Sequence, residues 1–256
     1  VGCASTTTRT QTSTQLDHEL AGTQRTDADR ARDAWRHPKE TLLFFGLRPE
    51  MTVVEITPNP GWYTKVIAPL LREHGRYIAA LPAAGAEEYS ERELQQFNAL
   101  VAAWPGSFGK VEIAPFVPGQ PIAQDGTADM VVTFRNIHNW MARDTAAAAF
   151  ESMYRVLKPG GVLGVVEHRG NAKVQQDPKA GSGYVNQDYA IQLIEKAGFR
   201  LVATSEINAN PKDTKDYPRG VWTLPPSLGE GDKDRARYQA IGESDRFTLK
   251  FVKPRN

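Results

Sequence analysis

The stretch "VVEITPNPGWYTKVIAPLL", Val53 to Leu71, decides the fold. An apolar run ends at an acidic residue, a short turn follows, and a helix-like pattern of apolar residues begins. This order is typical of the strand–turn–helix unit that opens a cofactor-binding α/β sheet. Such a turn is usually rich in glycine, whereas this one reads "TPNPG". The stretch therefore predicts the place of a cofactor loop, but with unusual residues in it.

Strand patterns alternate with helix-length segments on both sides of this stretch. We expect strands at 52–56, 76–81, 110–116, 128–134, 161–168, 200–207 and 247–253, and helices at 61–73, 86–103, 144–157 and 186–197. Apolar strands joined by helical crossovers predict a doubly wound parallel sheet. The last strand follows a polar excursion instead of a helix, so we expect it to be antiparallel beside the sixth. The predicted fold class is α/β, with a mostly parallel seven-stranded sheet and an antiparallel last strand.

Composition bounds the class of protein. A chain of 256 residues with 40% hydrophobic residues is long enough for one well-buried core and short for two full domains. The formal net charge is +1 and basic residues are scattered, so nothing indicates a nucleic-acid partner. The sequence has no run of about 18 apolar residues, the pattern that would predict a membrane span. From the chain length we therefore expect one core.

The N-terminal segment is polar and carries the single cysteine, Cys3. The letters "VGCAS" and the following Ser/Thr tract resemble the processed end of a bacterial lipoprotein, in which the signal peptide is removed and the cysteine is acylated. This reading predicts an exported, periplasmic or membrane-anchored protein, and the alternative is a cytoplasmic protein with an incidental cysteine. We expect residues 1–26 to be a flexible tether and residues 27–254 to form the domain.

Ligands of open α/β sheets lie at the carboxyl ends of the strands. After the first strand, Glu55 and Gly61 match the acidic residue and the last glycine of a cofactor loop, and Thr57 takes the place of another glycine. The carboxylate that would bind ribose hydroxyls after the second strand is missing near Pro82. The acidic residue expected near adenine falls in "VPGQP" (117–121) and is also missing.

The fourth strand ends in "TFRNIHNWMARD" (133–144) and the fifth in "VVEHRGN" (165–171). Neighbouring strands would bring two histidines, a carboxylate and two asparagines to one rim, which is the strongest functional signal in the chain. His138 or His168 could be a general base, with Glu167 orienting an imidazole. His and carboxylate ligands also suit a metal. Because adjacent strand residues point to opposite faces, one metal bound by both Glu167 and His168 is the minor alternative, and our prediction is no metal.

The excursion at 208–246 is rich in Pro, Gly and charge, and its Trp222, Tyr217 and Tyr238 indicate a segment anchored by aromatic side chains. We interpret it as a lid over the substrate, or else as a surface insertion. The segment "DKDRARYQAIG" (232–242) predicts a short helix inside it.

Five stretches together resemble a bacterial family of class I S-adenosylmethionine-dependent methyltransferases, whose members are often exported. They are "RHPKETLLFFGL", "VVEITPNPGWYTKVIAPLL", "TFRNIHNWM", "LKPGGVLGVVEHR" and "INANPKDTKDYPRGVWTLPP", and the likeness runs from about Asp27 to Pro254. The resemblance implies S-adenosylmethionine as cofactor. It implies as catalytic residues His138, His168 and Glu167, and as substrate-binding residues Asn139, Trp140 and Arg169. Together with the position of the loops, our predicted cofactor-binding residues are Glu55, Thr57, Gly61, Trp62 and Asn136, and Trp222 is a further predicted substrate-binding residue.

Two functions follow from these observations. The first is a methyltransferase that acts on a small or medium-sized molecule. The second is an exported protein of the same fold that has lost normal cofactor binding and serves as a binding protein, or as an enzyme that uses the His/Glu rim, with or without a metal. Binding of S-adenosylmethionine separates the two.

Overall fold

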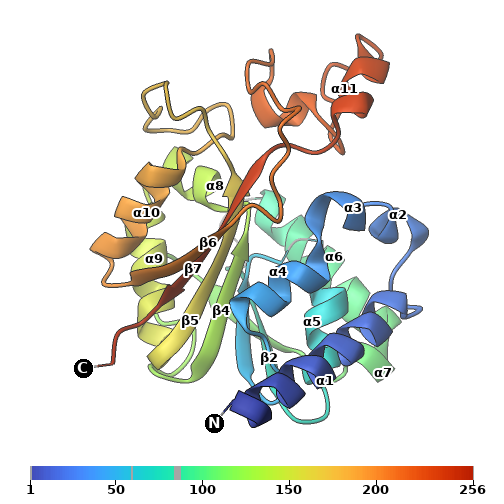
Figure 1. Ribbon diagram of the computed structural model, residues 1–256, viewed down its shortest axis with the longest axis vertical. Coiled ribbons are helices and arrows are strands. Elements are labelled where there is room, and N and C mark those ends of the chain that lie inside the picture. Colours follow the sequence, from blue (N-terminus) through green and yellow to red (C-terminus); the bar gives the residue numbers. More distant parts are fainter. Residues whose placement is uncertain (1, 59, 84–87, 256) are drawn as a thin grey trace.

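The computed structural model describes residues 2–58, 60–83 and 88–255, and the side chains of residues 9–58, 60–83 and 91–255. A seven-stranded sheet with the order β3-β2-β1-β4-β5-β7-β6 runs through the molecule (Figure 1). Its strands are β1 (Thr52–Ile56), β2 (Arg76–Pro82), β3 (Glu112–Phe116), β4 (Ala128–Phe134), β5 (Leu157–His168), β6 (Arg200–Ser205) and β7 (Arg246–Val252). The pairs among β1 to β5 are parallel, and β7 lies antiparallel between β5 and β6. The predicted class I methyltransferase fold is confirmed.

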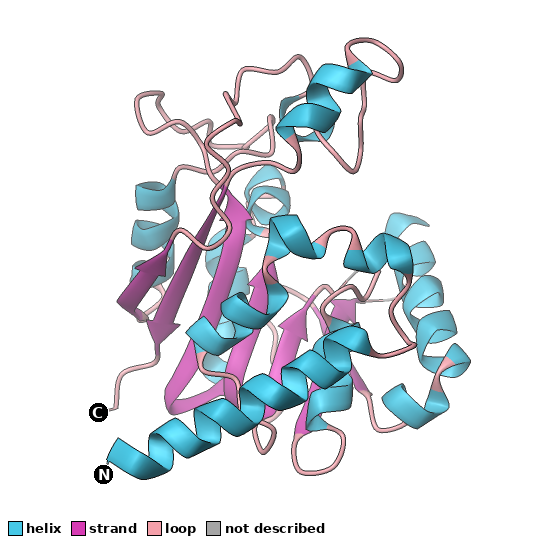
Figure 2. Ribbon diagram, turned by 45° about the vertical axis from the view of Figure 1, so that its right-hand side comes forward, coloured by secondary structure: helices cyan, strands magenta, loops and turns pink. Residues whose placement is uncertain are grey.

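Helices cover both faces of the sheet (Figure 2). They are α1 (Gly2–Ala21), α2 (Asp27–Arg30), α3 (Asp33–Arg36), α4 (Pro38–Phe45), α5 (Thr64–Leu71), α6 (Glu88–Ala103), α7 (Pro105–Phe108), α8 (Ile137–Ala142), α9 (Ala146–Val156), α10 (Gln187–Lys196) and α11 (Arg235–Ile241), with one 3-10 turn, η1 (Gly220–Thr223). One apolar core lies between the sheet and α8, α9 and α10, and it contains Phe150, Leu163 and Phe251. A second core lies under α1, α4 and α5 and contains Val53 and Ile67.

The strand boundaries follow from burial on both faces. Four of the five residues of β1 are buried, as are six of the seven in β4, which agrees with the apolar runs at 52–56 and 128–134. β5 begins earlier than expected, because "LKPGG" continues the strand instead of forming a separate turn. The pairing shifts by a bulge between Ala128 and Met130 at that point. The early start leaves the carboxyl end of β5 at His168, as predicted.

The N-terminal segment corrects one prediction. Residues 1–26 were expected to be a flexible tether, but Gly2–Ala21 is a 20-residue helix that lies along α4 and α5. Leu16 is fully buried in the core beneath it. The side chain of Gln24 donates to the Lys65 carbonyl oxygen at 3.0 Å. A mostly polar sequence can form such a helix because a few apolar contacts and hydrogen bonds dock it on the domain. The side chain of Cys3 lies outside the described residues.

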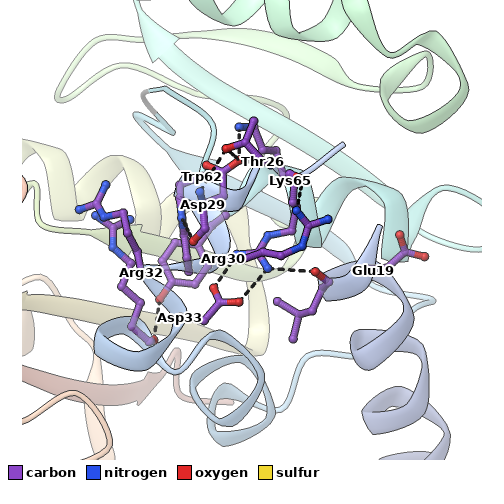
Figure 3. Close-up of polar contacts among 12 residues, drawn as sticks. Glu19, Thr26, Asp29, Arg30, Arg32, Asp33, Trp62 and Lys65 are labelled. Carbon is purple, nitrogen blue, oxygen red and sulfur yellow. Dashed lines mark hydrogen bonds and ion pairs between the residues drawn. The ribbon is translucent and has the colours of Figure 1, made fainter. Parts of the chain in front are cut away.

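The turn after α1 is fixed by polar contacts with the first βα unit (Figure 3). Thr26 and Asp29 form a reciprocal capping box at the start of α2. The Asp29 carboxylate pairs with Lys65 Nζ at 2.7 Å, and the Asp29 carbonyl accepts from Trp62 Nε1 at 3.2 Å. Trp62 therefore holds the N-terminal segment, in place of the cofactor contact predicted for it.

Segment 208–246 stands above the carboxyl ends of the strands, at the top of Figure 1. Tyr217 and Tyr238 pack with Tyr184 of the domain in a small apolar core, as expected of anchors, and α11 is the expected short helix. The third expected anchor, Trp222, is 39% exposed. Asp213 ties it down, because its carboxylate accepts from Tyr184 Oη at 2.9 Å and from the Asp245 backbone at 2.7 Å. Among the described residues, no helix combines the length and the apolar character that a membrane crossing requires.

Candidate active site

A cavity of about 470 Å³ lies at the carboxyl ends of the strands, under segment 208–246. The loops after β1, β2 and β3 supply Thr57, Pro82, Ala83, Val117 and Pro118, together with Phe116 at the end of β3. The ends of β4 and β5 and the helix α8 supply Phe134, Arg135, Asn136, His138, Asn139, Trp140 and His168. Segment 208–246 closes the cavity with Val221, Trp222, Pro225, Pro226, Ser227 and Ser244.

The structure sorts the predicted site residues into two groups. Those that line the cavity are Thr57, Asn136, His138, Asn139, Trp140, His168 and Trp222. Those that do not line it are Glu55, Gly61, Trp62, Glu167 and Arg169. The side chains of the second group contact other residues in place of the cavity, and their partners differ from one residue to the next.

Arg169 lies behind the rim. Its guanidinium pairs with Glu206 at 2.7 Å and lies 3.8 Å from a carboxylate oxygen of Asp245. It therefore ties the end of β5 to the segment that connects β6 and β7. The prediction that Arg169 contacts the substrate directly does not agree with this placement.

Two residues of the loop after β1 have a left-handed backbone. Thr57 has φ 49° and Gly61 has φ 92°, both in the left-handed region. The φ of Gly61 favours glycine, and a Cβ there would come within 2.4 Å of the end of the Leu100 side chain, which would have to shift. Thr57 is β-branched, and the left-handed conformation costs such a residue about 1 to 2 kcal/mol. The strain lies where the chain faces the cavity, in the position predicted for the cofactor.

Glu55 stabilises this loop from below. Its buried carboxylate accepts hydrogen bonds from Tyr77 Oη at 2.6 Å and Thr64 Oγ1 at 3.3 Å. Burial raises the pKa of Glu55 to about 7, although the two hydrogen bonds lower it in part. The side chain joins β1, β2 and α5 and makes no contact with the cavity. This placement corrects its predicted role as a cofactor ligand.

Asn136 connects the ends of β1 and β4. Its side-chain amide donates to the Ile56 carbonyl oxygen at 3.0 Å and to Thr133 Oγ1 at 3.1 Å. The residue also lines the cavity, so it holds the cofactor loop and the histidine rim in one arrangement.

Glu167 organises the histidine rim. One carboxylate oxygen accepts from the backbone of Ile137 at 2.6 Å and of His138 at 3.3 Å. The other accepts from the His168 backbone at 2.8 Å and lies 3.1 Å from His138 Nδ1. An ionised carboxylate only accepts hydrogen bonds, so Nδ1 of His138 carries the proton and Nε2 is the basic nitrogen. Glu167 thus orients the His138 imidazole without reaching the cavity itself.

His168 lies beside His138 and is neutral. The two ring centroids are 5.4 Å apart, and His168 Nδ1 is 2.5 Å from Ser244 Oγ. Burial, followed by the electrostatic interaction with His138 and by the charge of Arg246, holds the pKa of His168 well below its ordinary value. A neutral imidazole can donate or accept one hydrogen bond at the cavity, which suits substrate positioning.

His138, Glu167 and His168 place ligand-type atoms within 4.8 Å of one another, close enough to surround a metal ion. We expected Glu167 and His168 to point to opposite faces, too far apart for one metal, and this expectation is wrong because their ligand-type atoms lie close together. Both carboxylate oxygens of Glu167, however, already accept hydrogen bonds from three backbone amides and an imidazole. A metal would have to displace these donors, so the observed hydrogen bonds favour acid–base chemistry at this rim.

The half of the cavity under β1, β2 and β3 fits S-adenosylmethionine. Phe116 at the end of β3 and Val117 just after it offer apolar walls of the kind that suits an adenine ring. Glu93 on α6 lines the same half and is only 3% exposed, which puts a carboxylate where the loop after β2 lacks one. No sequence pattern predicts Glu93 at the site, because it lies inside a helix and not at the end of a strand.

Comparison with known proteins agrees with this geometry. A family model described as a methyltransferase domain matches residues 74–165. A search of curated protein sequences gave no significant match. Among solved structures, a SAM-dependent methyltransferase from Aquifex aeolicus has a TM-score of 0.60 and 16% identity, over 87% of this chain and 93% of its own.

Two further structures show how broadly this fold is used. A phosphoethanolamine N-methyltransferase of Haemonchus contortus, in complex with S-adenosyl-L-methionine, has a TM-score of 0.58 and 15% identity, over 86% of this chain and 53% of its own. The cyclase SpnF has a TM-score of 0.58 and 14% identity, over 86% and 81%. At such low identity these likenesses show the fold alone, and the domain match adds the activity class. The chain thus has a class I methyltransferase fold, and together the findings support an S-adenosylmethionine-dependent methyltransferase.

Proposed function

We propose that this protein transfers a methyl group from S-adenosylmethionine to a hydroxyl or amine of a small or medium-sized molecule, with His138 as the general base. Bound S-adenosylmethionine supplies an electrophilic methyl group. The observation that carries the proposal is the contact of His138 with Glu167, which leaves a basic imidazole nitrogen at the cavity. A base in this position removes the proton from the attacking atom as the new bond forms.

The other rim residues position the acceptor in this proposal. Asn139, Trp140 and His168 line the cavity beside His138, and Trp222 meets its ring edge-on with centroids 5.9 Å apart. Trp222 comes from segment 208–246, so this segment covers the acceptor side and limits the entry of water. The lid interpretation is part of the proposal.

Cofactor binding is the first test. Purified protein is titrated with S-adenosylmethionine and S-adenosylhomocysteine by calorimetry, and we expect both to bind below millimolar concentration. The absence of heat and of a thermal shift at millimolar ligand would overturn the methyltransferase assignment.

The role of His138 is tested by formation of S-adenosylhomocysteine with a panel of phenols, amines and hydroxy acids. His138→Ala should lower kcat by about 10² to 10⁴, the usual contribution of a general base, and change cofactor affinity little. His74→Ala is the matched control, because His74 is exposed and distant from the cavity. Equal kcat in wild type and His138→Ala would remove His138 from the mechanism.

A further inference from the structure

We propose that the methyl acceptor carries an anionic group, a carboxylate or a phosphate, that Arg135 and Arg246 bind at the rim of the cavity. The inference rests on the proposed function and adds the class of acceptor to it. It depends on an excess of buried positive charge beside the two histidines.

Four arginines surround a single carboxylate, Glu243, which is 2% exposed. Arg32 Nε donates to one of its oxygens at 2.5 Å, and Arg36 Nε donates to the other at 3.3 Å. Arg246 pairs with that second oxygen as well. Burial opposes ionisation of Glu243, but Arg246 and the other arginines outweigh it and hold the pKa of Glu243 well below its usual range. Glu243 is therefore charged, and one negative charge faces three paired guanidinium groups.

Arg135 is the fourth guanidinium, and its charge interacts with that of Glu243. Among the described residues its side chain makes no hydrogen bond or ion pair, although it lines the cavity. Its backbone is left-handed, with φ 63°, and its amide donates to the Val166 carbonyl oxygen at 2.7 Å. Burial, followed by the charge of Arg246, lowers the pKa of Arg135 to about 10, so it keeps its charge at neutral pH. The uncommon left-handed backbone of Arg135 thus places its guanidinium, which is unpaired among the described residues, at the rim of the cavity.

Arg246 adds an unfilled hydrogen-bond position. It is 2% exposed and lines the cavity, and its Nε is buried without a hydrogen-bond partner. A buried donor without a partner costs about 1 to 3 kcal/mol. An anion in the cavity would accept hydrogen bonds from these guanidinium groups and neutralise part of their mutual repulsion. Guanidinium groups match carboxylate and phosphate geometry better than any other side chain.

The arginines lie on the acceptor side of the cavity. Arg246 is the first residue of β7 and pairs in register with His168 at the end of β5. Arg135 follows β4 directly, three residues before His138. The apolar walls and Glu93 belong to the other half, under the ends of β1, β2 and β3. An acceptor held by its anionic end at Arg135 and Arg246 would present its remaining atoms to the two histidines.

The test uses the full chain saturated with S-adenosylhomocysteine. Benzoate, phenyl phosphate and the neutral benzamide are titrated by calorimetry, and the two anions separate a carboxylate site from a phosphate site. We expect at least one anion to bind about tenfold or more tightly than benzamide. Arg135→Gln should remove about tenfold to hundredfold of that affinity, in line with the loss of a charged hydrogen bond. Arg155→Gln, which removes an exposed arginine, should leave the affinity unchanged.

A second measurement does not depend on any ligand. Because neighbouring arginines repel Arg135, and no hydrogen bond or ion pair holds its side chain among the described residues, Arg135→Gln should unfold at the same temperature as wild type or about 2 to 4 °C higher. Arg135→Lys keeps the charge and should not show the gain. A large drop in the unfolding temperature of Arg135→Gln would show a structural role and overturn the charge argument.

The remaining outcomes are distinct. Equal binding of benzoate, phenyl phosphate and benzamide overturns the proposal. A second result would also overturn it: Arg135→Gln binds S-adenosylhomocysteine more weakly than wild type does, but binds 5′-methylthioadenosine, which lacks the carboxylate, equally well. The arginines would then bind the carboxylate of the cofactor and not that of the acceptor. If S-adenosylhomocysteine fails to bind while anion affinity still depends on Arg135, the proposed function fails and the anion site stands.

Discussion

Glu55 and Glu167 are both buried, and they lie near the ends of β1 and β5, the two strands that flank β4. Glu55 receives hydrogen bonds from two hydroxyl groups, and burial raises its pKa to about 7. Glu167 receives hydrogen bonds from three backbone amides and an imidazole. The comparison shows that the number and kind of donors, more than burial, decide what a carboxylate does.

Position alone does not reveal this difference. Both residues end an apolar strand, and both were predicted to belong to the site. Glu55 supports the packing of the first βα unit. Glu167 holds the His138 imidazole in place and sets which of its nitrogens carries the proton. The following four predictions test or sharpen this contrast, from the largest expected effect to the smallest.

Glu167→Gln should have the largest effect. The amide nitrogen of Gln would face donors where a carboxylate oxygen now accepts, so we expect a loss of about 3 kcal/mol in the free energy of unfolding. The methyl-transfer rate should fall by about 10² or more, because His138 loses its orientation. Chemical denaturation and turnover measure the two effects, and Glu151→Gln on the exposed face of α9 is the control. A fully active and stable Glu167→Gln protein would contradict the role given to this side chain.

Glu55→Gln should change the way in which the free energy of unfolding depends on pH. The pKa of Glu55 is raised in the folded state, so its contribution is fully present below the ordinary value near 4.5 and is lost as pH rises through about 7. This loss amounts to about 3 kcal/mol at most, by linkage. We expect Glu55→Gln to match wild type at pH 5 and to be about 2 kcal/mol more stable at pH 8. A difference between the two proteins that stays constant from pH 5 to pH 8 would show that Glu55 is ionised throughout.

Thr57→Gly should stabilise the loop above Glu55. A protein with Ala at a given position is normally more stable than one with Gly by about 0.5 to 1 kcal/mol. The left-handed φ at Thr57 reverses this order. We expect Thr57→Gly to be about 1 kcal/mol more stable than Thr57→Ala, which keeps the Cβ and its strain. Urea unfolding of the two variants measures the difference. The ordinary order, with Ala above Gly, would mean that the loop relaxes to another conformation.

Trp222→Ala should have the smallest effect, because it removes only the aromatic contact with His138. Trp222 is 39% exposed and contributes one edge-on aromatic contact, so we expect KM for the acceptor to rise about fivefold, the usual size of such a contact. Trp104→Ala is a close control, because Trp104 is 37% exposed and does not line the cavity. Equal KM values in the two variants would show that segment 208–246 does not touch the acceptor.

The fold could be read from the sequence because strand burial and strand order are recorded in local patterns. The apolar runs at 52–56 and 128–134 coincide with β1 and β4. The convergence of His138, Glu167 and His168 could also be predicted, because neighbouring parallel strands end at one edge. The helix at Gly2–Ala21 could not, since its polar composition resembles a tether, and contacts with distant elements, such as those of Leu16 and Leu20 with the core and of Asp17 with Lys39, dock it.

The parts of the site that escaped prediction depend on tertiary placement. Glu93 lies in the middle of a helix, and Arg246 begins a strand far along the chain. The separate roles of Glu55 and Glu167 depend on donors from other elements, such as Tyr77 and the first turn of α8. No local pattern records such donors, so both residues look alike in the sequence.

The insertion of β7 between β5 and β6 has a consequence for motion. Segment 208–246 leaves β6 and returns as β7, its antiparallel neighbour, so both of its ends are fixed in one hydrogen-bonded ladder. If the contact of Asp213 with Tyr184 opens, such a segment can turn about that ladder like a flap on a hinge. Arg246 stands at the hinge, and Trp222 stands on the flap. A molecule that touches both residues would therefore join the two sides of the hinge, and its residence time would measure how often the flap opens.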